Sequence, residues 1–180
     1  MIEFLRPVND ELIEFSADLN ENQIGRNITQ LVEEEIAIEK GAIVLFFVPE
    51  YRGCCEDLQN NQDQIWSIRK FFYQLYLGNW KHALVDLGDI VPGNTLADTY
   101  FALQKVTEKI LEQKAIPLIL GGSQDLTYYQ YRAFDQIDGM VNIVSVDHCF
   151  DLGDNKQQLN NHNFLSHAIV NKPYNLFNHT

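Results

Sequence analysis

Short apolar runs recur along the chain, each bounded by polar or turn-forming residues. They occupy 43–48, 83–87, 116–120 and 142–146, and the first is ended by Pro49. A continuous apolar run of this length is typical of a strand buried on both faces, as the strands of parallel sheets are. The pattern therefore predicts four strands of a parallel sheet.

Between these runs, apolar residues recur at the three- and four-residue spacing of an amphipathic helix. The spacing predicts helices over 65–76, 96–110 and 126–134, one after each of the first three strands, and a further helix over 164–170. The same spacing over 24–36 predicts a helix in the acidic N-terminal part of the chain. Strands that alternate with helices in this way indicate βαβ units.

The fold class follows from this alternation and from the absence of an internal repeat or a linker. We predict a single α/β domain over 1–180, with a parallel sheet flanked by helices. Thr95, followed by Asp98, has the spacing of a capping box at the start of the second helix. After Asp154 the chain becomes polar and offers no further obvious strand, so the sheet would end in a poorly covered edge. We therefore expect the fold to be incomplete, as in a piece of a longer protein.

Three charged residues fall inside otherwise apolar segments. Arg69 lies in the helix predicted over 65–76, and we expect it to pack or pair on that helix. Asp86 and Asp89 bracket a Leu-Gly pair after the second strand, and we interpret them as turn residues.

Charge and cysteine content narrow the class of partner. The chain has 13 Lys and Arg against 25 Asp and Glu, a net charge of -12. A field of this sign repels nucleic acid and anionic lipid, so neither is an expected partner. No apolar run approaches the roughly 20 residues that span a bilayer, and the acidic N-terminus does not resemble a signal peptide. Cys54, Cys55 and Cys149 suggest no disulfide framework, and we expect a cytoplasmic protein.

Unusual polar residues follow the third and fourth predicted strands, where parallel sheets bind ligands. In an extended VDHCFD segment, Asp147, Cys149 and Asp151 would project to one side and His148 to the other. Two carboxylates that flank a third ligand suit a cation, although the spacing taken alone favours a solvated acidic loop. The diglycine Gly121-Gly122 permits a tight turn, and no phosphate-loop lysine follows it.

Several segments taken together resemble the ureohydrolase family of arginase, agmatinase and formimidoylglutamase. They run in order from 43 to 151 and include FFVPEYRG, QIWSIRKFFYQL, VDLGDI, PLILGGSQD and VDHCFD. The formimidoylglutamase-like branch is the most similar. The resemblance implies a three-layer α/β fold, two manganese ions that activate a hydroxide, and hydrolysis of a C–N bond in a guanidino or formimino substrate. It also implies that this chain covers the N-terminal half and forms homo-oligomers.

Carried over by position, the family's metal ligands are only partly matched. Asp147 and Asp151 stand at aspartate ligand positions, whereas Gln124 and Cys149 stand where the family has histidines. His162 lies in a polar loop where the family often contacts substrate. A neutral amide is a weaker ligand than imidazole, and a thiolate suits manganese poorly. We therefore expect the manganese pair to be absent or weakly bound.

These residues favour one function and leave others open. The first hypothesis is a divergent metallohydrolase with a degraded metal site, inactive as this chain. The first alternative is a zinc-dependent amidohydrolase that uses Asp147, Cys149 and Asp151. The second is a metal-free module in which the two aspartates bind a guanidinium directly, or in which the fold serves only assembly.

Overall fold

The computed structural model describes residues 1–32, 36–54, 62–137 and 139–180, without the side chains of 62–65 and 136. Cys55 therefore lies outside the described residues. In chain order the elements are the 3-10 helix η1 (Ile2–Phe4), β1 (Leu5–Arg6), α1 (Asp10–Ala17), α2 (Ile24–Asn27), β2 (Thr29–Gln30), β3 (Ile43–Phe47), α3 (Gln62–Gln74), β4 (Leu84–Ile90), α4 (Leu96–Glu112), β5 (Ile116–Leu120), α5 (Leu126–Arg132), η2 (Ala133–Gln136), β6 (Val141–Ile143), α6 (Phe164–Val170) and β7 (Leu176–His179).

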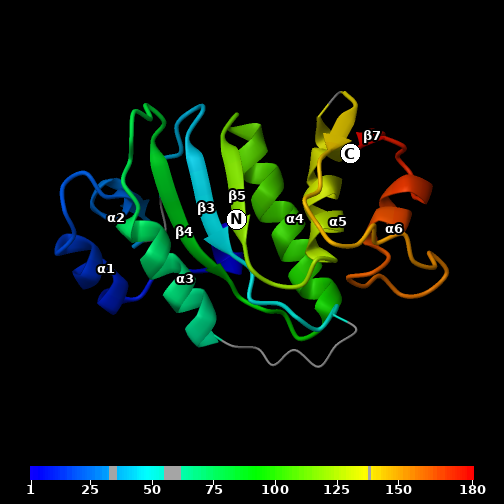
Figure 1. The fold of residues 1–180 in the computed structure, drawn as a ribbon, viewed down its shortest axis with the longest axis horizontal. Helices are drawn as coiled ribbons and strands as arrows, with labels where there is room; N and C mark the ends of the chain where they lie inside the picture. The colour runs from blue at the N-terminus through cyan, green and yellow to red at the C-terminus, as the bar shows by residue number, and fades with distance from the viewer. Residues whose placement is uncertain (33–35, 55–61, 138) are drawn as a thin grey trace.

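A twisted sheet of five strands forms the centre of the molecule (Figure 1). Strand β3 lies inside it and pairs in parallel with β4 on one side and with β5 on the other. The short strands β2 and β1 both pair with β4, the first in parallel and the second antiparallel. The predicted parallel α/β sheet is confirmed, with one antiparallel strand at its margin.

Both faces of β3 are covered, which explains its continuous apolar sequence. Val44, Phe46 and Val48 pack into one core cluster, together with the apolar side of α4. Leu45 and Phe47 point the other way, into a cluster with residues of α1, α2 and α3. All five residues are at most 1% exposed. Because burial of such a side chain contributes about 1.5–3 kcal/mol, this strand fixes the three-layer arrangement of helices, sheet and helices.

A buried ion network joins α3 to β4. The Arg69 guanidinium lies 3.0 Å from the Asp86 carboxylate and 2.8 Å from that of Asp89, and the Arg69 and Asp86 side chains are 4% and 0% exposed. Tyr73 donates a 2.9 Å hydrogen bond to Asp86, and the guanidinium stacks 4.0 Å from the Phe47 ring centroid. The interpretation of Asp86 and Asp89 as turn residues is therefore wrong, because β4 continues through both of them and they pair across elements with Arg69.

The capping box of α4 is confirmed. Thr95 Oγ1 accepts from the backbone N–H of Asp98 at 3.2 Å, and the Asp98 carboxylate accepts from the N–H of Thr95 at 2.8 Å. The two bonds satisfy N–H groups that the first turn of a helix leaves free. Helices α3, α5 and α6 also lie where the apolar spacing predicts them.

The helix predicted over 24–36 is wrong beyond its first turn. Only α2 is helical, and β2 follows it at once. The backbone N–H of Leu31 donates to the carbonyl of Asp86 at 2.8 Å, so pairing with β4 replaces helical hydrogen bonds there. Tertiary pairing has overridden a helical periodicity. Residues 33–35 lie outside the described part of the chain.

The fourth predicted strand exists but does not join the main sheet. Strand β6 is shorter than expected and pairs in parallel with β7, a strand that the sequence pattern did not indicate. The two form a separate sheet that stands apart from β5 (Figure 1). Val144 and Val146, expected inside this strand, lie beyond its end, the first 75% exposed and the second fully exposed.

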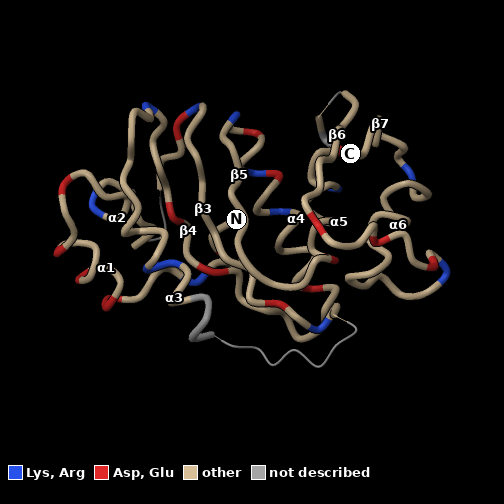
Figure 2. Tube along the Cα trace, in the orientation of Figure 1, with Lys and Arg blue, Asp and Glu red and all other residues tan. Residues whose placement is uncertain are grey.

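Charged residues are distributed over the whole molecule. Within the described ranges, Lys and Arg lie scattered along the trace rather than gathered on one face (Figure 2). No helix of the described chain is both long enough and apolar enough to cross a bilayer.

The Arg69 network generates a prediction for stability. We expect Arg69→Met to lower the free energy of unfolding by about 3–5 kcal/mol, because it leaves the Asp86 carboxylate buried without its counter-charge. Lys109→Met is the control, since Lys109 and Glu112 form an exposed pair, and it should change the free energy of unfolding far less than Arg69→Met does. Urea denaturation followed by circular dichroism measures both, and equal losses would contradict the proposed role of Arg69.

Candidate functional site

The ends of β5 and β6 lead to side chains that meet. Gln124 follows β5 through the turn at Gly121-Gly122, where both glycines have positive φ. A Cβ atom at Gly122 would lie 2.6 Å from the carbonyl oxygen of Glu50, so only glycine allows the turn after β5 to pass this close to the loop after β3. Gln124 Nε2 donates a short hydrogen bond to the carboxylate of Asp147, which lies beyond β6.

The carboxylate of Asp147 accepts several hydrogen bonds. Besides Gln124, the backbone N–H groups of His148 and Cys149 donate to Oδ1 at 2.5 and 3.3 Å. These bonds lower the pKa of Asp147 to about 2, with the Gln124 side chain as the largest cause. Asp147 is therefore an anion at neutral pH, stabilised by hydrogen bonds from neutral donors.

Asp151 lies in a different environment. Its side chain is 4% exposed, its φ is +50°, and its Oδ1 lies 3.8 Å from Nδ1 of His162. Burial raises the pKa of Asp151, and the neighbouring charge of Asp147 raises it further. The structure thus brings together four of the five residues singled out from the sequence: Gln124, Asp147, Asp151 and His162. His162 joins the cluster through Asp151, and its side chain is half-exposed.

The extended geometry expected for VDHCFD is not observed. His148 does not point away from the carboxylates, because its Nδ1 lies 2.9 Å from Asp147 Oδ1 while its side chain is 92% exposed. Asp147 bonds to the two N–H groups that follow it and so turns the chain, and the left-handed conformation of Asp151 turns it again. Cys149, expected as the central ligand, is an exposed free thiol. Within the described residues, no three His, Cys, Asp or Glu side chains are grouped so that they could hold a metal ion.

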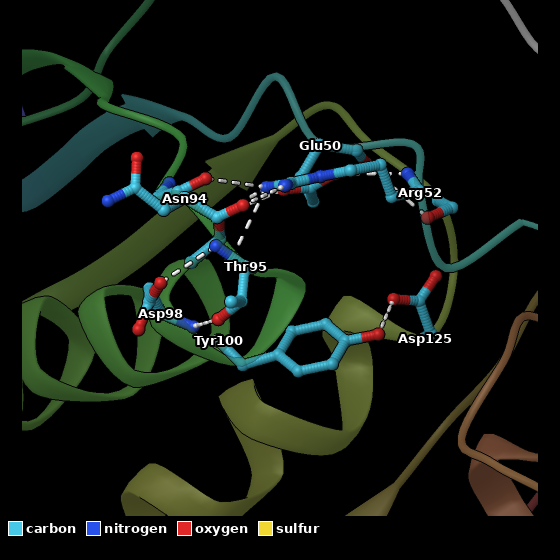
Figure 3. Close-up of polar contacts among 10 residues, drawn as sticks. Glu50, Arg52, Asn94, Thr95, Asp98, Tyr100 and Asp125 are labelled. Atoms are coloured by element: carbon cyan, nitrogen blue, oxygen red, sulfur yellow. Dashed lines mark hydrogen bonds and ion pairs between the residues drawn. The ribbon is translucent and has the colours of Figure 1, made fainter.

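A buried polar network supports the loops around this cluster (Figure 3). Glu50, 2% exposed, accepts from the Arg52 guanidinium at 2.5 and 2.9 Å and from the Thr99 hydroxyl at 2.8 Å. Burial alone would raise the pKa of Glu50, but the hydrogen bonds from Arg52 outweigh it and the pKa is lowered. Arg52 also donates to the carbonyls of Gly93 and Asn94 and so ties the loop after β3 to the loop before α4.

Asp125 is the second buried carboxylate of this network. It is 0% exposed and accepts a short hydrogen bond from the hydroxyl of Tyr100 on α4, as Figure 3 shows. Burial raises the pKa of Asp125. A Cβ atom at Gly53 would lie 2.1 Å from the carboxylate of Asp125, so a larger residue at Gly53 would collide with that carboxylate. The carbonyl of Gly53 accepts a hydrogen bond from the backbone N–H of Asn161 at 3.1 Å. Asp125 therefore packs against the loop that contacts the segment carrying His162.

Sequence reasoning missed this network because its partners are far apart in the chain. Glu50 and Thr99 are 49 residues apart, and Tyr100 and Asp125 are 25 apart. The local signal was the position of Asp125 directly after Gln124, in the loop that follows β5. The assignment of Gln124, Asp147, Cys149 and Asp151 as degenerate ligand positions stays a prediction.

Similar proteins are found by sequence and by structure. A segment of 66 residues is 36% identical to formimidoylglutamase of Halobacterium salinarum and covers 36% of this chain and 22% of that protein. Formiminoglutamase of Trypanosoma cruzi, solved with Mn²⁺, superposes with a TM-score of 0.64 at 20% identity over 73% of this chain and 48% of that one. Formimidoylglutamase of Bacillus subtilis superposes with a TM-score of 0.66 at 16% identity over 77% and 46%.

The superpositions show a shared fold, and the chain spans about half the length of these two solved structures. The family itself is shown by sequence, since residues 61–178, well over half of the chain, match the arginase family model. The predicted resemblance is therefore confirmed, and this chain belongs to the arginase family.

Proposed function

We propose that this chain is part of a divergent formimidoylglutamase-like metallohydrolase whose metal site is degraded, and that these 180 residues alone do not hydrolyse a guanidino or formimino substrate. The observation that carries the proposal is the hydrogen bond from Gln124 to Asp147. It places an amide donor where a cation would have to bind.

The donor set supports this proposal. The amide nitrogen of Gln124 is a donor only, so in this orientation it offers a metal no lone pair. A carboxyl group has to lose its proton before it can bind a metal ion. The raised pKa of Asp151 makes that loss less favourable than for an ordinary aspartate, so Asp151 is a weaker ligand. Cys149 is exposed and is a soft ligand, which suits manganese poorly. The residues present therefore do not fit a pair of manganese ions.

One alternative draws support from the charge state of the cluster. Asp147 keeps its negative charge down to about pH 2, so it can pair with a guanidinium without a metal. A small guanidino or formimino ligand would then be held by Asp147 and Asp151, with His162 beside Asp151. The zinc alternative, with Asp147, Cys149 and Asp151, requires a regrouping of side chains that do not converge in the described structure.

We also propose that the protein is cytoplasmic and forms homo-oligomers.

The Gln124 hydrogen bond generates a prediction for pH dependence. We expect Gln124→Ala to raise the pKa of Asp147 from about 2 toward the ordinary value of about 3.9, because its largest stabilising contact is lost. A lowered carboxyl pKa stabilises the fold above the pKa of the unfolded chain, and this advantage disappears as the pH falls toward 2. The stability difference between the two proteins should therefore shrink over that range.

An NMR titration of the Asp147 carboxyl carbon measures this pKa directly. Gln104→Ala is the matched control, because Gln104 bonds to Glu108 on α4 and not to Asp147. An Asp147 pKa that is the same in all three proteins would show that Gln124 does not supply the proposed contact.

Metal titration tests the proposed function itself. We expect chelator-treated chain to show no tight manganese binding by calorimetry and no hydrolysis of arginine, agmatine or formiminoglutamate. The double variant Gln124→His, Cys149→His restores the imidazoles of the family pattern and should strengthen manganese binding about tenfold or more. Gln130→His, on α5, is the control for an added histidine.

Three results, two from the titration and one from a thermal-shift assay, would count against the proposed function or favour one of its alternatives. Stoichiometric, tight manganese binding by the unaltered chain would contradict a degraded site. Tight zinc binding that is lost in Cys149→Ala would support the zinc alternative instead. Stabilisation by arginine in a thermal-shift assay without metal, lost in Asp147→Asn, would favour direct guanidinium binding.

A further inference from the structure

Three lysines precede three neighbouring strands at one edge of the main sheet. Lys81, Lys40 and Lys114 stand two or three residues before the first residues of β4, β3 and β5. These strands are parallel and their first residues lie opposite one another, so the three lysines reach the same edge. Figure 1 shows the loops that carry them side by side, and Figure 2 shows a basic segment at the tip of each loop. This amino-terminal edge lies opposite the carboxyl end of β5, which leads to Gln124.

Hydrogen bonds hold these three loops together. The backbone N–H of Gly41 donates to the carbonyl of Lys114 at 2.9 Å, and Nδ1 of His82 lies 2.8 Å from the carbonyl oxygen of Gly41. Since a carbonyl oxygen only accepts, Nδ1 of His82 is the donor, and its Nε2 bonds to no described residue. Lys40 and Lys81 are the chain neighbours of Gly41 and His82. These bonds therefore position all three lysines next to one another.

The row of lysines lacks counter-charges among the described residues. Seven of the 13 Lys and Arg side chains form ion pairs with described carboxylates, whereas Lys40, Lys81 and Lys114 form none with them and are exposed. Within the described parts of the three loops, Glu39 is the acidic residue. Basic residues are scattered over the molecule as a whole and its net charge is -12, so this row creates a local positive potential in an acidic protein.

A hollow opens beside this row. It has a volume of about 480 Å³ and is lined by Ile43, Asn79, Trp80, Lys81 and His82. Sites for small molecules have volumes of roughly 300–1,000 Å³. Trp80 is 58% exposed, so much of its indole is available to a ligand. The hollow thus combines a flat aromatic wall with an ammonium group and an imidazole, and the other two lysines lie in the adjoining loops.

We propose that this hollow binds a small anion that carries a flat aromatic ring, of the class of a nucleoside monophosphate. The ring stacks on the indole of Trp80, as bases stack on aromatic side chains with little dependence on which base is present. The phosphate lies among the ammonium groups of Lys40, Lys81 and Lys114. Its three oxygens accept several hydrogen bonds at once, which suits a row of donors better than a carboxylate does.

The charge of the whole chain fits a ligand of this size. A net charge of -12 repels the many phosphates of nucleic acid, whereas a ligand with one phosphate meets the local row of cations. Gln124 and Asp147 lie beyond the carboxyl ends of their strands, away from this edge. The inference therefore goes beyond the proposed function and does not depend on whether a metal binds.

Calorimetry with adenosine and uridine monophosphate, in buffer that contains a chelator, tests the proposal. Adenosine and inorganic phosphate are the matched half-ligands, and each should bind at least about tenfold more weakly than adenosine monophosphate. Trp80→Ala and Lys81→Ala should each weaken nucleotide binding about tenfold, because they remove the stacking surface and a charge-assisted contact. Trp80→Phe keeps a ring and should retain most of the affinity. Lys156→Ala, at an exposed lysine beyond β6, is the control and should bind as the unaltered chain does.

Three results would overturn the proposal. The first is that neither nucleotide binds at millimolar concentration. The second is nucleotide binding that is unchanged in both Trp80→Ala and Lys81→Ala, because the ligand would then occupy another site. The third is inorganic phosphate that binds as tightly as the nucleotides, which would leave no role for the ring. Both altered side chains are exposed, so we expect the variants to fold, and circular dichroism checks this.

Discussion

Among the residues that the structure describes, the backbone of β3 is paired on both sides, and the backbones of β5 and β6 are paired on only one. This constraint shapes the rest of the molecule, since buried strand backbones need hydrogen-bond partners. Where pairing is complete, both faces are covered and the side chains are fully buried, as at Phe46 and Phe47. Where it stops, apolar residues such as Val144 are left exposed and a hollow opens beside α4 and α5. The molecule thus combines a five-stranded sheet with a separate two-stranded sheet.

The candidate site lies where the ends of these two parts meet. Its residues come from loops that are fixed on one side by the buried Glu50, Arg52 and Asp125 network. The amide of Gln124 joins the loop after β5 to the carboxylate of Asp147 beyond β6. That contact stabilises the charge of Asp147 with a neutral donor. Burial and the charge of Asp147 raise the pKa of Asp151. The chemistry of an arginase-family site is accordingly reduced to a hydrogen-bonded cluster in our proposal.

Local sequence was informative wherever local physics decides the outcome. The apolar run of β3, the Thr95–Asp98 capping box and the diglycine turn each follow from their own residues. The helix expected over 24–36 failed because Leu31 bonds to β4, which is distant in sequence. His148 was misplaced because Asp147 turns its own chain. The separation of β6 from β5 could not be predicted, because an apolar strand sequence does not reveal which strands will pair with it.

Hydrogen exchange of the chain, measured by NMR at single amides, shows whether the edges of β5 and β6 are unpaired. The amides of Ile119 and Val144 should exchange rapidly, because both face unpaired edges, whereas those of Leu118 and Ser145 should be protected by pairing with β3 and β7. Protection of Ile119 and Val144 equal to that of their neighbours would contradict this expectation, because the two edges would then already be paired in this chain.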